Sequence, residues 1–385
     1  MSILIDLSYV NSEVKLRESV ALYALKVLRG LNEISCEPIT LLVAEEMQEY
    51  FQKHFSSFPQ IQYPKYNRYL KSFPYIKGIY KMWVWKYFLN RLNFNVVYIP
   101  FSWSGNSPKI SSKKIITIHD LRPMRELHSV GTNSRLFHIL RINKVILRIF
   151  KKIYLKQIKN AERVITISNY VKNDVLKEWP DVSEDKLITI YNSISLSEYA
   201  VPPMIKLNKP FILYVNTLNS YKNVGTLMRA YKNIFDEIPH NLVIVGKETA
   251  YWEECKVQIV SSDLSKRIIH IRYCSDEELR WLYEHAALFV TTSTREGFGY
   301  TPIEAAVCGC PVISTLSESL GEVTDGLLNY YYPPTNVEML GQLIKQILLK
   351  PIQQEDLFKI SSHFRYKYST HLQVRKIIEL LQSYA

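Results

Sequence analysis

Two glutamates separated by a glycine-containing turn are the residues of this sequence best suited to chemistry. Glu296 and Glu304 lie in the stretch TREGFGYTPIEAAVCGCPV, residues 294–312, with Gly297 and Gly299 between them. Glycine lets the backbone pass close to a bound group. The first turn of a helix offers free N–H groups and a positive dipole end, which suits phosphate. The pattern therefore indicates a site for a phosphate-bearing ligand bordered by two carboxylates.

The segments around these glutamates predict a strand, a loop, a helix and a second strand. AALFVTTS and VIST read as strands, and TPIEAAVCG reads as the helix between them. Thr301 fits the N-cap of that helix, Pro302 its first position and Gly309 its left-handed stop. Open α/β sheets bind ligands at the carboxyl ends of their strands. An alternative stays open for Glu304, because Thr301-x-x-Glu304 is also a capping-box pattern; Glu296 precedes the helix and has no such use.

Short apolar segments alternate with helical segments along the first half of the chain. Strands of this kind are typical of parallel sheets that are buried on both faces. The predicted strands are Ile3–Leu7, Thr40–Val43, Val96–Ile99, Ile115–His119 and Arg163–Ser168, and Val14–Leu31 is a predicted helix. The alternation predicts βαβ units and a doubly wound sheet.

The alternation stops in proline-rich and polar chain near residues 197–209 and then restarts. PFILYV, NLVIVG, IIHIRY and ALFVTTS read as the strands of a second sheet. A chain of 385 residues is also long for a single core. We therefore expect an α/β fold of two Rossmann-like domains whose parallel sheets face a central cleft, with residues 1–200 in the first domain and 201–366 in the second. The final helical stretch, 367–385, is expected to rejoin the first domain.

The composition, 47% hydrophobic and 22% charged, is that of a globular chain and not of a disordered one. No uncharged apolar run reaches the roughly 18 residues of a transmembrane helix, and the N-terminus lacks the pattern of a signal peptide. The five cysteines are odd in number and lie mostly in apolar contexts, so buried thiols in a reducing cytoplasm are favoured over disulfides or a zinc site. These cysteines are Cys36, Cys255, Cys274, Cys308 and Cys310.

The stretch STREGFGYTPIEAAVCGCPVIST closely resembles the E-x7-E signature of retaining glycosyltransferases with the GT-B fold, in the large family four, the group 1 type. Other segments resemble the same family, in family order along almost the whole chain: KKIITIHDLRPM, AERVITISNYVKNDVL, FILYVNTLNSYKNVGTLMRAY and LVIVGK. The resemblance implies transfer of a hexosyl group from a nucleotide-sugar donor to a saccharide or lipid-linked saccharide, with retention at the anomeric carbon. It implies a role in the synthesis of a surface polysaccharide or glycolipid.

The resemblance also implies roles for individual residues. Glu296 would bond hydroxyls of the donor sugar. Glu304 would bond the ribose, since a carboxylate accepts two hydrogen bonds from a vicinal diol. Lys222 would pair with the diphosphate and stabilise the leaving charge, and His119 would contact the sugar near the anomeric centre. Further nucleotide-sugar contacts would come from Gly297, Phe298, Gly299, Thr217, Gly246, Tyr273 and Cys274.

The scheme implied by the family needs no cofactor and no metal beyond the nucleotide-sugar substrate. Enzymes that use a metal at such a leaving group usually carry an Asp-x-Asp pair, and this sequence has none. The departing phosphate itself would take the acceptor proton on the same face. The sequence departs from the family pattern because no glycine precedes Gly30, and because Thr217 and Tyr221 stand where many members have an arginine. Arg295 or Lys247 could compensate.

The formal net charge of +12 lies entirely in residues 1–200. From Phe51 to His119 there is no acidic residue, but there are eleven Lys or Arg and seventeen aromatic residues, and residues 135–160 add eight cations without an acid. Three interpretations stay open: a solvated surface over core aromatics, nucleic acid binding, and docking on an anionic membrane. No recognition motif accompanies the charge, so we expect no nucleic acid. Our hypothesis is that residues 64–92 and 135–160 face the inner leaflet.

The sequence therefore predicts a cytoplasmic glycosyltransferase, peripheral on the inner face of the cell membrane. Two rivals stay open. One is a nucleotide-sugar epimerase of the same fold, which would convert the donor without an acceptor. The other is a non-catalytic, membrane-associated relative, against which Lys222, His119 and the two glutamates argue.

Overall fold

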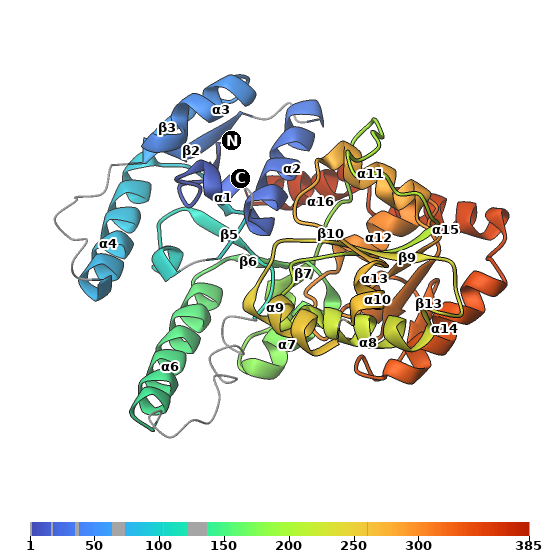
Figure 1. Cartoon of the computed structure of the whole chain (residues 1–385). Coiled ribbons are helices and arrows are strands. Elements are labelled where there is room, and N and C mark those ends of the chain that lie inside the picture. Colours follow the sequence, from blue (N-terminus) through green and yellow to red (C-terminus); the bar gives the residue numbers. More distant parts are fainter. Residues whose placement is uncertain are drawn as a thin grey trace. The chain divides into compact units, whose positions relative to one another are not determined.

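The computed structural model describes residues 2–16, 18–34, 38–63, 74–102, 104–121, 137–259 and 261–384. The chain forms two compact units (Figure 1). Unit 1 comprises Met1–Ser193 and Thr370–Ala385, and unit 2 comprises Ile194–Ser369. The chain thus passes from the first unit to the second after Ser193, where the sequence placed the division at residue 200, and it returns to the first unit for its final helix.

Unit 1 is built on a seven-stranded sheet in the order β3-β2-β1-β4-β5-β6-β7, in which every pairing is parallel. The central strands are almost completely buried because both faces are covered. The strands are β1 (Ile3–Asp6), β2 (Ile39–Ala44), β3 (Gln60–Tyr63), β4 (Val96–Ile99), β5 (Lys113–Ile118), β6 (Arg163–Thr166) and β7 (Leu187–Thr189).

The helices of unit 1 connect these strands, as βαβ units require. The helix predicted over Val14–Leu31 is two helices in the structure, since α1 ends at Leu16 and α2 begins at Ser19. The described helices are α1 (Glu13–Leu16), α2 (Ser19–Ile34), η1 (Glu45–Met47), α3 (Gln48–His54), α4 (Pro74–Leu92), η3 (Ser104–Asn106), α6 (Phe137–Lys159), α7 (Asn169–Glu178), η4 (Glu184–Lys186) and α16 (Thr370–Gln382).

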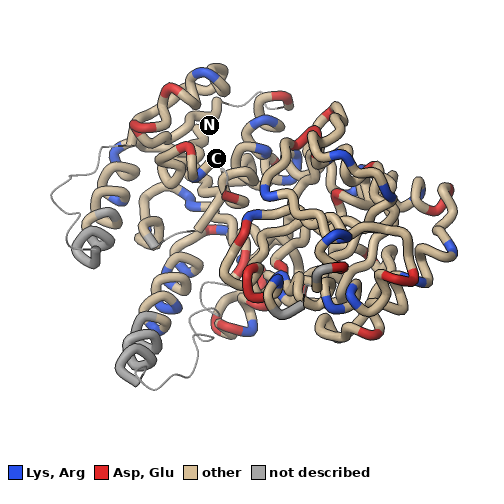
Figure 2. The backbone as a smooth tube through the Cα atoms, viewed as in Figure 1, with Lys and Arg blue, Asp and Glu red and all other residues tan. Residues whose placement is uncertain are grey.

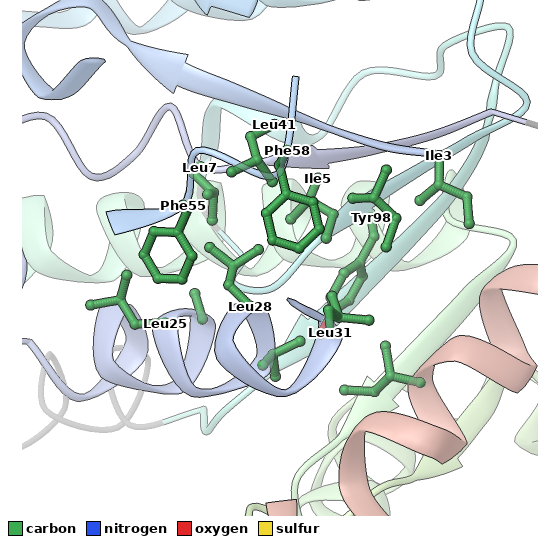
Figure 3. Packing of buried hydrophobic residues seen from close by; sticks show 14 of the residues in the cluster. Ile3, Ile5, Leu7, Leu25, Leu28, Leu31, Leu41, Phe55, Phe58 and Tyr98 are labelled. Carbon is green, nitrogen blue, oxygen red and sulfur yellow. The ribbon is translucent and has the colours of Figure 1, made fainter. Parts of the chain in front are cut away.

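The main core of unit 1 lies between α2 and the sheet. Figure 3 shows Leu28 and Leu31 of α2 pointing toward Ile5 of β1 and Tyr98 of β4, all nearly or fully buried. The C-terminal helix α16 packs on α2, and a Cβ added at Gly30 would lie 2.6 Å from a methyl carbon of Val374. Glycine in this helix therefore permits the close approach of the last element of the chain.

Unit 2 is built on a six-stranded parallel sheet in the order β10-β9-β8-β11-β12-β13. The strands are β8 (Phe211–Val215), β9 (Asn241–Val245), β10 (Ile268–Ile271), β11 (Leu288–Val290), β12 (Val312–Thr315) and β13 (Asn329–Tyr331). The expected fold class, α/β with two parallel Rossmann-like sheets, is confirmed.

The helices of unit 2 alternate with its strands. The most amphipathic of them, α8, buries eight of its eleven residues, Val224 and Leu227 among them, in the core around β8 and β9. The described helices are η5 (Ser220–Lys222), α8 (Val224–Ile234), α9 (Ala250–Ile259), α10 (Ser262–Ser265), α11 (Asp276–His285), α12 (Tyr300–Val307), α13 (Leu320–Val323), α14 (Val337–Leu349) and α15 (Gln354–Lys367).

Candidate functional site

The strand order of unit 2 reverses between β8 and β11, which are hydrogen-bonded neighbours in the middle of the sheet. The chain leaves β8 toward β9 on one side and leaves β11 toward β12 on the other. Such a reversal opens a crevice at the carboxyl ends of the two strands, where open α/β sheets bind ligands. Lys222 lies in the loop after β8 and Glu296 in the loop after β11, so both candidates lie at this position.

Lys222 and Glu296 form an ion pair. The Lys222 Nζ lies 2.6 Å from Oε1 of Glu296, and the side chains are only 10% and 12% exposed. The pair joins residues that are 74 positions apart in the sequence. The two residues that the family resemblance assigns to the donor diphosphate and the donor sugar are therefore in direct contact.

The Lys222 loop is fixed by hydrogen bonds to its backbone. The Lys222 carbonyl accepts from the Tyr214 hydroxyl at 2.9 Å and from the Thr292 hydroxyl at 3.0 Å. Asn223, which follows, has a left-handed backbone with φ of 56°, and its side-chain amide donates to the carbonyl of Pro334 at 2.8 Å. These buried bonds hold the start of α8 and set the direction in which Lys222 leaves the loop.

The Glu296 loop is held by two residues that follow β12. The Glu296 N–H donates to Oε2 of Glu318 at 2.7 Å, and the Ser319 hydroxyl donates to the Glu296 carbonyl at 2.7 Å. The same hydroxyl lies 3.1 Å from the carbonyl of Phe298. Sequence reasoning missed Glu318 and Ser319, because nothing in their types indicates that they fold back on a loop more than twenty positions earlier.

The helix after Glu296 starts earlier than predicted. Gly299, with φ of 93°, is the N-cap of α12, and Tyr300 is its first residue. Thr301 and Pro302 therefore lie inside the first turn, and the prediction that Thr301 caps the helix is wrong. The left-handed conformation predicted for Gly309 is confirmed, with φ of 78°.

Glu304 has a partner outside its own helix. The hydroxyl of Tyr283, on α11, donates to Oε2 of Glu304 at 3.1 Å. Burial, together with the charge of Glu304, holds the pKa of Tyr283 well above its usual value, so the phenol keeps its proton and donates it. Because Thr301 lies inside the helix and does not cap it, Glu304 is not the partner of Thr301 in a capping box.

The other predicted contact residues occupy several positions in unit 2. Phe298 is 2% exposed, and its ring packs against those of Tyr300 and Tyr368, so only its backbone is available to a ligand. Gly246 follows β9, and a Cβ there would lie 2.0 Å from the carbonyl oxygen of Asn216, so this position requires glycine.

Thr217, Tyr273 and Cys274 complete the predicted set. Thr217 lies exposed in the loop after β8. Tyr273, 79% exposed, and Cys274 follow β10, the edge strand, and two strands separate them from the β11 loop. Burial raises the pKa of the Cys274 thiol to about 11, so it is not a thiolate at neutral pH.

His119 belongs to unit 1, where it follows β5 at the carboxyl edge of the sheet. Its Nε2 donates to the carbonyl of Pro100 at 2.9 Å, and its ring meets that of Tyr23 edge to face. Burial lowers the pKa of His119, so the imidazole is neutral at physiological pH. With Nε2 carrying the proton, Nδ1 is the acceptor nitrogen of this ring.

Among the described residues, no cluster of three or more His, Cys, Asp or Glu side chains has the arrangement of a metal site. The described cysteines Cys255, Cys274, Cys308 and Cys310 are all free thiols.

Two parallel Rossmann-like sheets in one chain are the arrangement of the GT-B fold. The family model described as "Glycosyltransferase Family 4" matches residues 20–198, and the one described as "Glycosyl transferases group 1" matches residues 198–362. The chain belongs to the group 1 glycosyltransferases with the GT-B fold.

Curated relatives agree with this assignment. The O-antigen chain mannosyltransferase RfbU of Salmonella typhimurium is 30% identical over 233 residues, which cover 60% of each protein. The serotype-specific mannosyltransferase WbdA of Escherichia coli is 25% identical over 319 residues, covering 75% of this chain and 37% of the relative. The matches thus span less than two thirds of the length of either relative.

Solved structures show the same fold at low identity. Sucrose-phosphate synthase from Thermosynechococcus elongatus superimposes with a TM-score of 0.72 at 16% identity, covering 100% of this chain and 98% of that one. The Anabaena protein HepE in complex with UDP-glucose gives a TM-score of 0.69 at 15% identity, covering all of both chains.

Proposed function

We propose that this protein transfers a hexosyl group from a nucleotide-sugar donor to a saccharide or lipid-linked saccharide acceptor, in the assembly of a surface polysaccharide or glycolipid. The observation that carries the proposal is the Lys222–Glu296 ion pair at the switch point between β8 and β11. It puts a cation for a diphosphate and a carboxylate for sugar hydroxyls side by side where the fold binds ligands.

The ion pair suggests how the donor is bound. The Lys222 ammonium is neutralised by the Glu296 carboxylate. A sugar diphosphate brings negative charge to the same place, so Lys222 would pair with the diphosphate while Glu296 accepts hydrogen bonds from the sugar. The cation is then positioned to stabilise the charge that develops on the leaving diphosphate. Glu304, oriented by Tyr283, would accept from the ribose hydroxyls.

The reaction we propose retains the configuration of the anomeric carbon. The bond from that carbon to the phosphate oxygen breaks, and the bond to the acceptor oxygen forms on the same face. The acceptor proton goes to the departing phosphate, so no covalent enzyme intermediate is needed. His119 would contact the sugar near the reacting carbon as a neutral group. Lys222 and the first turn of α12 would supply the positive charge, so the scheme is independent of a metal.

The relatives point to the sugars that should be tested first. RfbU and WbdA are named as mannosyltransferases, and HepE was solved with UDP-glucose. The test is a thermal-shift screen against GDP-, UDP- and dTDP-sugars, since a tight ligand raises the melting temperature by mass action. Sugar transfer to acceptor saccharides is then measured with the donor that binds. A screen in which no nucleotide sugar shifts the melting temperature contradicts the proposal.

We also propose that unit 1 rests on the cytoplasmic face of the membrane through α4 and α6. Residues 64–73 and 135–136 of the predicted surface lie outside the described residues. On the described part of α4, Tyr80, Trp83 and Tyr87 form an exposed stripe at helical spacing. The opposite face buries Trp85 and Leu89. Exposed indole and phenol rings favour the headgroup zone of a membrane.

The charge of the two helices supports the same orientation. Figure 2 shows Lys and Arg, but no Asp or Glu, along the described parts of α4 and α6. No helix among the described residues combines the length and apolarity needed to span a bilayer. Flotation with liposomes tests peripheral binding: preference for anionic over neutral vesicles supports it, and equal binding contradicts it.

A further inference from the structure

Unit 1 contains a cavity of about 330 Å³ between α4, α6 and the loop after η3. Small-molecule sites usually have volumes of about 300–1,000 Å³, so this one is large enough for a ligand. Its lining residues are Met82, Trp83, Lys86, Pro108, Lys109, Lys156 and Asn160. Three of the seven are lysines and none is acidic.

The cavity lies at the opposite edge of the sheet from the groups expected to meet the sugar. α4 ends just before β4, Lys109 precedes β5, and Asn160 precedes β6, so its walls come from the amino ends of these strands. His119 follows β5 at the carboxyl edge. The cavity is therefore separate from His119, the residue of unit 1 that we expect to contact the sugar.

Hydrogen bonds tie the three walls to one another. The Ser107 hydroxyl lies 3.6 Å from the Met82 sulfur on α4, and the Ser107 carbonyl accepts from the Asn160 side chain at 2.8 Å. The Lys114 ammonium donates to the carbonyls of Asn106 and Pro108, both at 2.8 Å. These bonds fix the loop between the helices, so the cavity is a built feature of the fold.

Several cations close to the cavity have partners of their own. Lys113 pairs with Glu162 and Lys151 pairs with Glu178. Lys186 donates to carbonyls at the end of α6. In contrast, none of the ammonium groups of the cavity makes a hydrogen bond or ion pair within the described part of the chain. These groups are Lys86, Lys109 and Lys156.

We propose that this cavity binds a phosphate-bearing group with at least two negative charges, held by Lys86, Lys109 and Lys156 beside the indole of Trp83. Unpaired ammonium groups at one concave site are point-charge ligands for phosphate oxygens. The group could belong to a free pyrophosphate-type ligand or to the headgroup of an anionic lipid. The proposal does not depend on sugar transfer. It is narrower than the membrane surface above, because it names one cavity and the three ammonium groups that would hold the ligand.

The test is a residue-resolved lysine footprint on the full chain. The protein is acetylated with a water-soluble amine-reactive ester, and the rate at each lysine is read by mass spectrometry. It is run with inorganic pyrophosphate against sodium chloride of equal ionic strength. It is also run with vesicles of phosphatidylglycerol and phosphatidylcholine against phosphatidylcholine alone. Exposed lysines elsewhere in unit 1, Lys53, Lys177 and Lys376, are the internal controls.

We expect acetylation of the three cavity lysines to slow about fivefold or more, while the control lysines change little. Protection by free pyrophosphate assigns a soluble ligand. Protection by anionic vesicles alone assigns a lipid headgroup. Both results support the site. The proposal is overturned if neither treatment protects the cavity lysines, or if the control lysines are protected equally.

A pair of matched triple variants gives an independent readout. K86Q/K109Q/K156Q removes the cavity charges, and K53Q/K177Q/K376Q removes the same net charge elsewhere. The affinity for the probe that gave protection should fall by about 100-fold in the first variant and little in the second. Each cavity lysine is expected to contribute about fivefold to that affinity. Equal loss in both variants means a general charge effect and overturns the site. Donor-induced thermal shifts should survive in both, so failure here is distinguishable from failure of the proposed transfer.

Discussion

The backbone N–H of Glu296 donates a 2.7 Å hydrogen bond to the carboxylate of Glu318. Glu318 holds a left-handed backbone with φ of 52°, which costs a residue with a Cβ about 1 kcal/mol or more. The loop after β12 therefore keeps a charged side chain in a strained conformation, and that side chain fixes the backbone of the glutamate we assign to the donor sugar.

Replacing Glu318 tests whether this bond positions Glu296. Glu318→Gly removes the acceptor and relieves the backbone strain, so the fold should keep most of its stability. A shifted Glu296 should lower kcat about 10- to 100-fold, because misplacement by about 1 Å has effects of that size. Glu318→Gln keeps an acceptor oxygen and should retain most activity in steady-state assays. Wild-type kcat in Glu318→Gly means that the bond has no positioning role.

Breaking the Lys222–Glu296 pair should destabilise unit 2. Lys222→Met leaves a nearly buried carboxylate without its cation, which costs about 3 kcal/mol or more. Adding Glu296→Gln removes the orphaned charge and should restore much of the loss. Urea unfolding of the two single variants and the double variant measures the coupling. Additive losses would show that the pair is not coupled in solution.

Tyr283→Phe should weaken donor binding through Glu304. The substitution keeps the buried ring and removes the hydroxyl that donates to Glu304. With one oxygen of the carboxylate no longer oriented, we expect donor KM to rise about fivefold, the typical effect of losing one hydrogen bond, with kcat nearly unchanged. Glu304→Gln should raise KM further. A fall in kcat at constant KM would place Glu304 at the reacting carbon and contradict its ribose role.

Lys114 should make the stability of unit 1 depend on pH. Burial, with a contribution from the charge of Lys186, lowers the pKa of Lys114 to about 7. In the unfolded chain the pKa of a lysine is about 10.4. Between these values the unfolded chain binds the extra proton, so stability rises with pH. The wild type should gain about 2 kcal/mol relative to Lys114→Met from about pH 7 to about pH 9. If the stability difference between the wild type and Lys114→Met stays constant or falls over this pH range, Lys114 is not a buried amine that loses its proton.

Much of the fold follows from pattern alone, because apolar β-branched runs of four to six residues mark parallel strands. β4 was predicted over the residues it has, and the long central strands to within a residue or two. The short strand β13 (Asn329–Tyr331) and the edge strands β3 and β7 were missed. Edge strands are half exposed and β13 has only three residues, so their sequences carry little hydrophobic signal.

The candidate site, like the fold, could be predicted from the sequence only in part. Glu296 could be chosen from its place in a glycine turn after a recognisable strand, whereas Lys222 was assigned through the family resemblance. The contact between Glu296 and Lys222 could not be predicted, because it depends on β8 and β11 being neighbours in the sheet. Tyr283 and Glu318 could not be found at all, because each acts through a side chain that reaches another element. Thr301 was misread because a glycine in left-handed conformation can itself start a helix.

The measurement that tests the central claim most directly is sugar transfer by Glu296→Gln with the donor identified in the thermal-shift screen. We predict that the wild type forms a glycosylated product, and that the variant loses about 1,000-fold in kcat. The nucleotide diphosphate should still raise the melting temperature of the variant, which shows that the fold and Lys222 remain intact. Wild-type turnover by Glu296→Gln, or conversion of the donor to an epimer without transfer, would contradict the account.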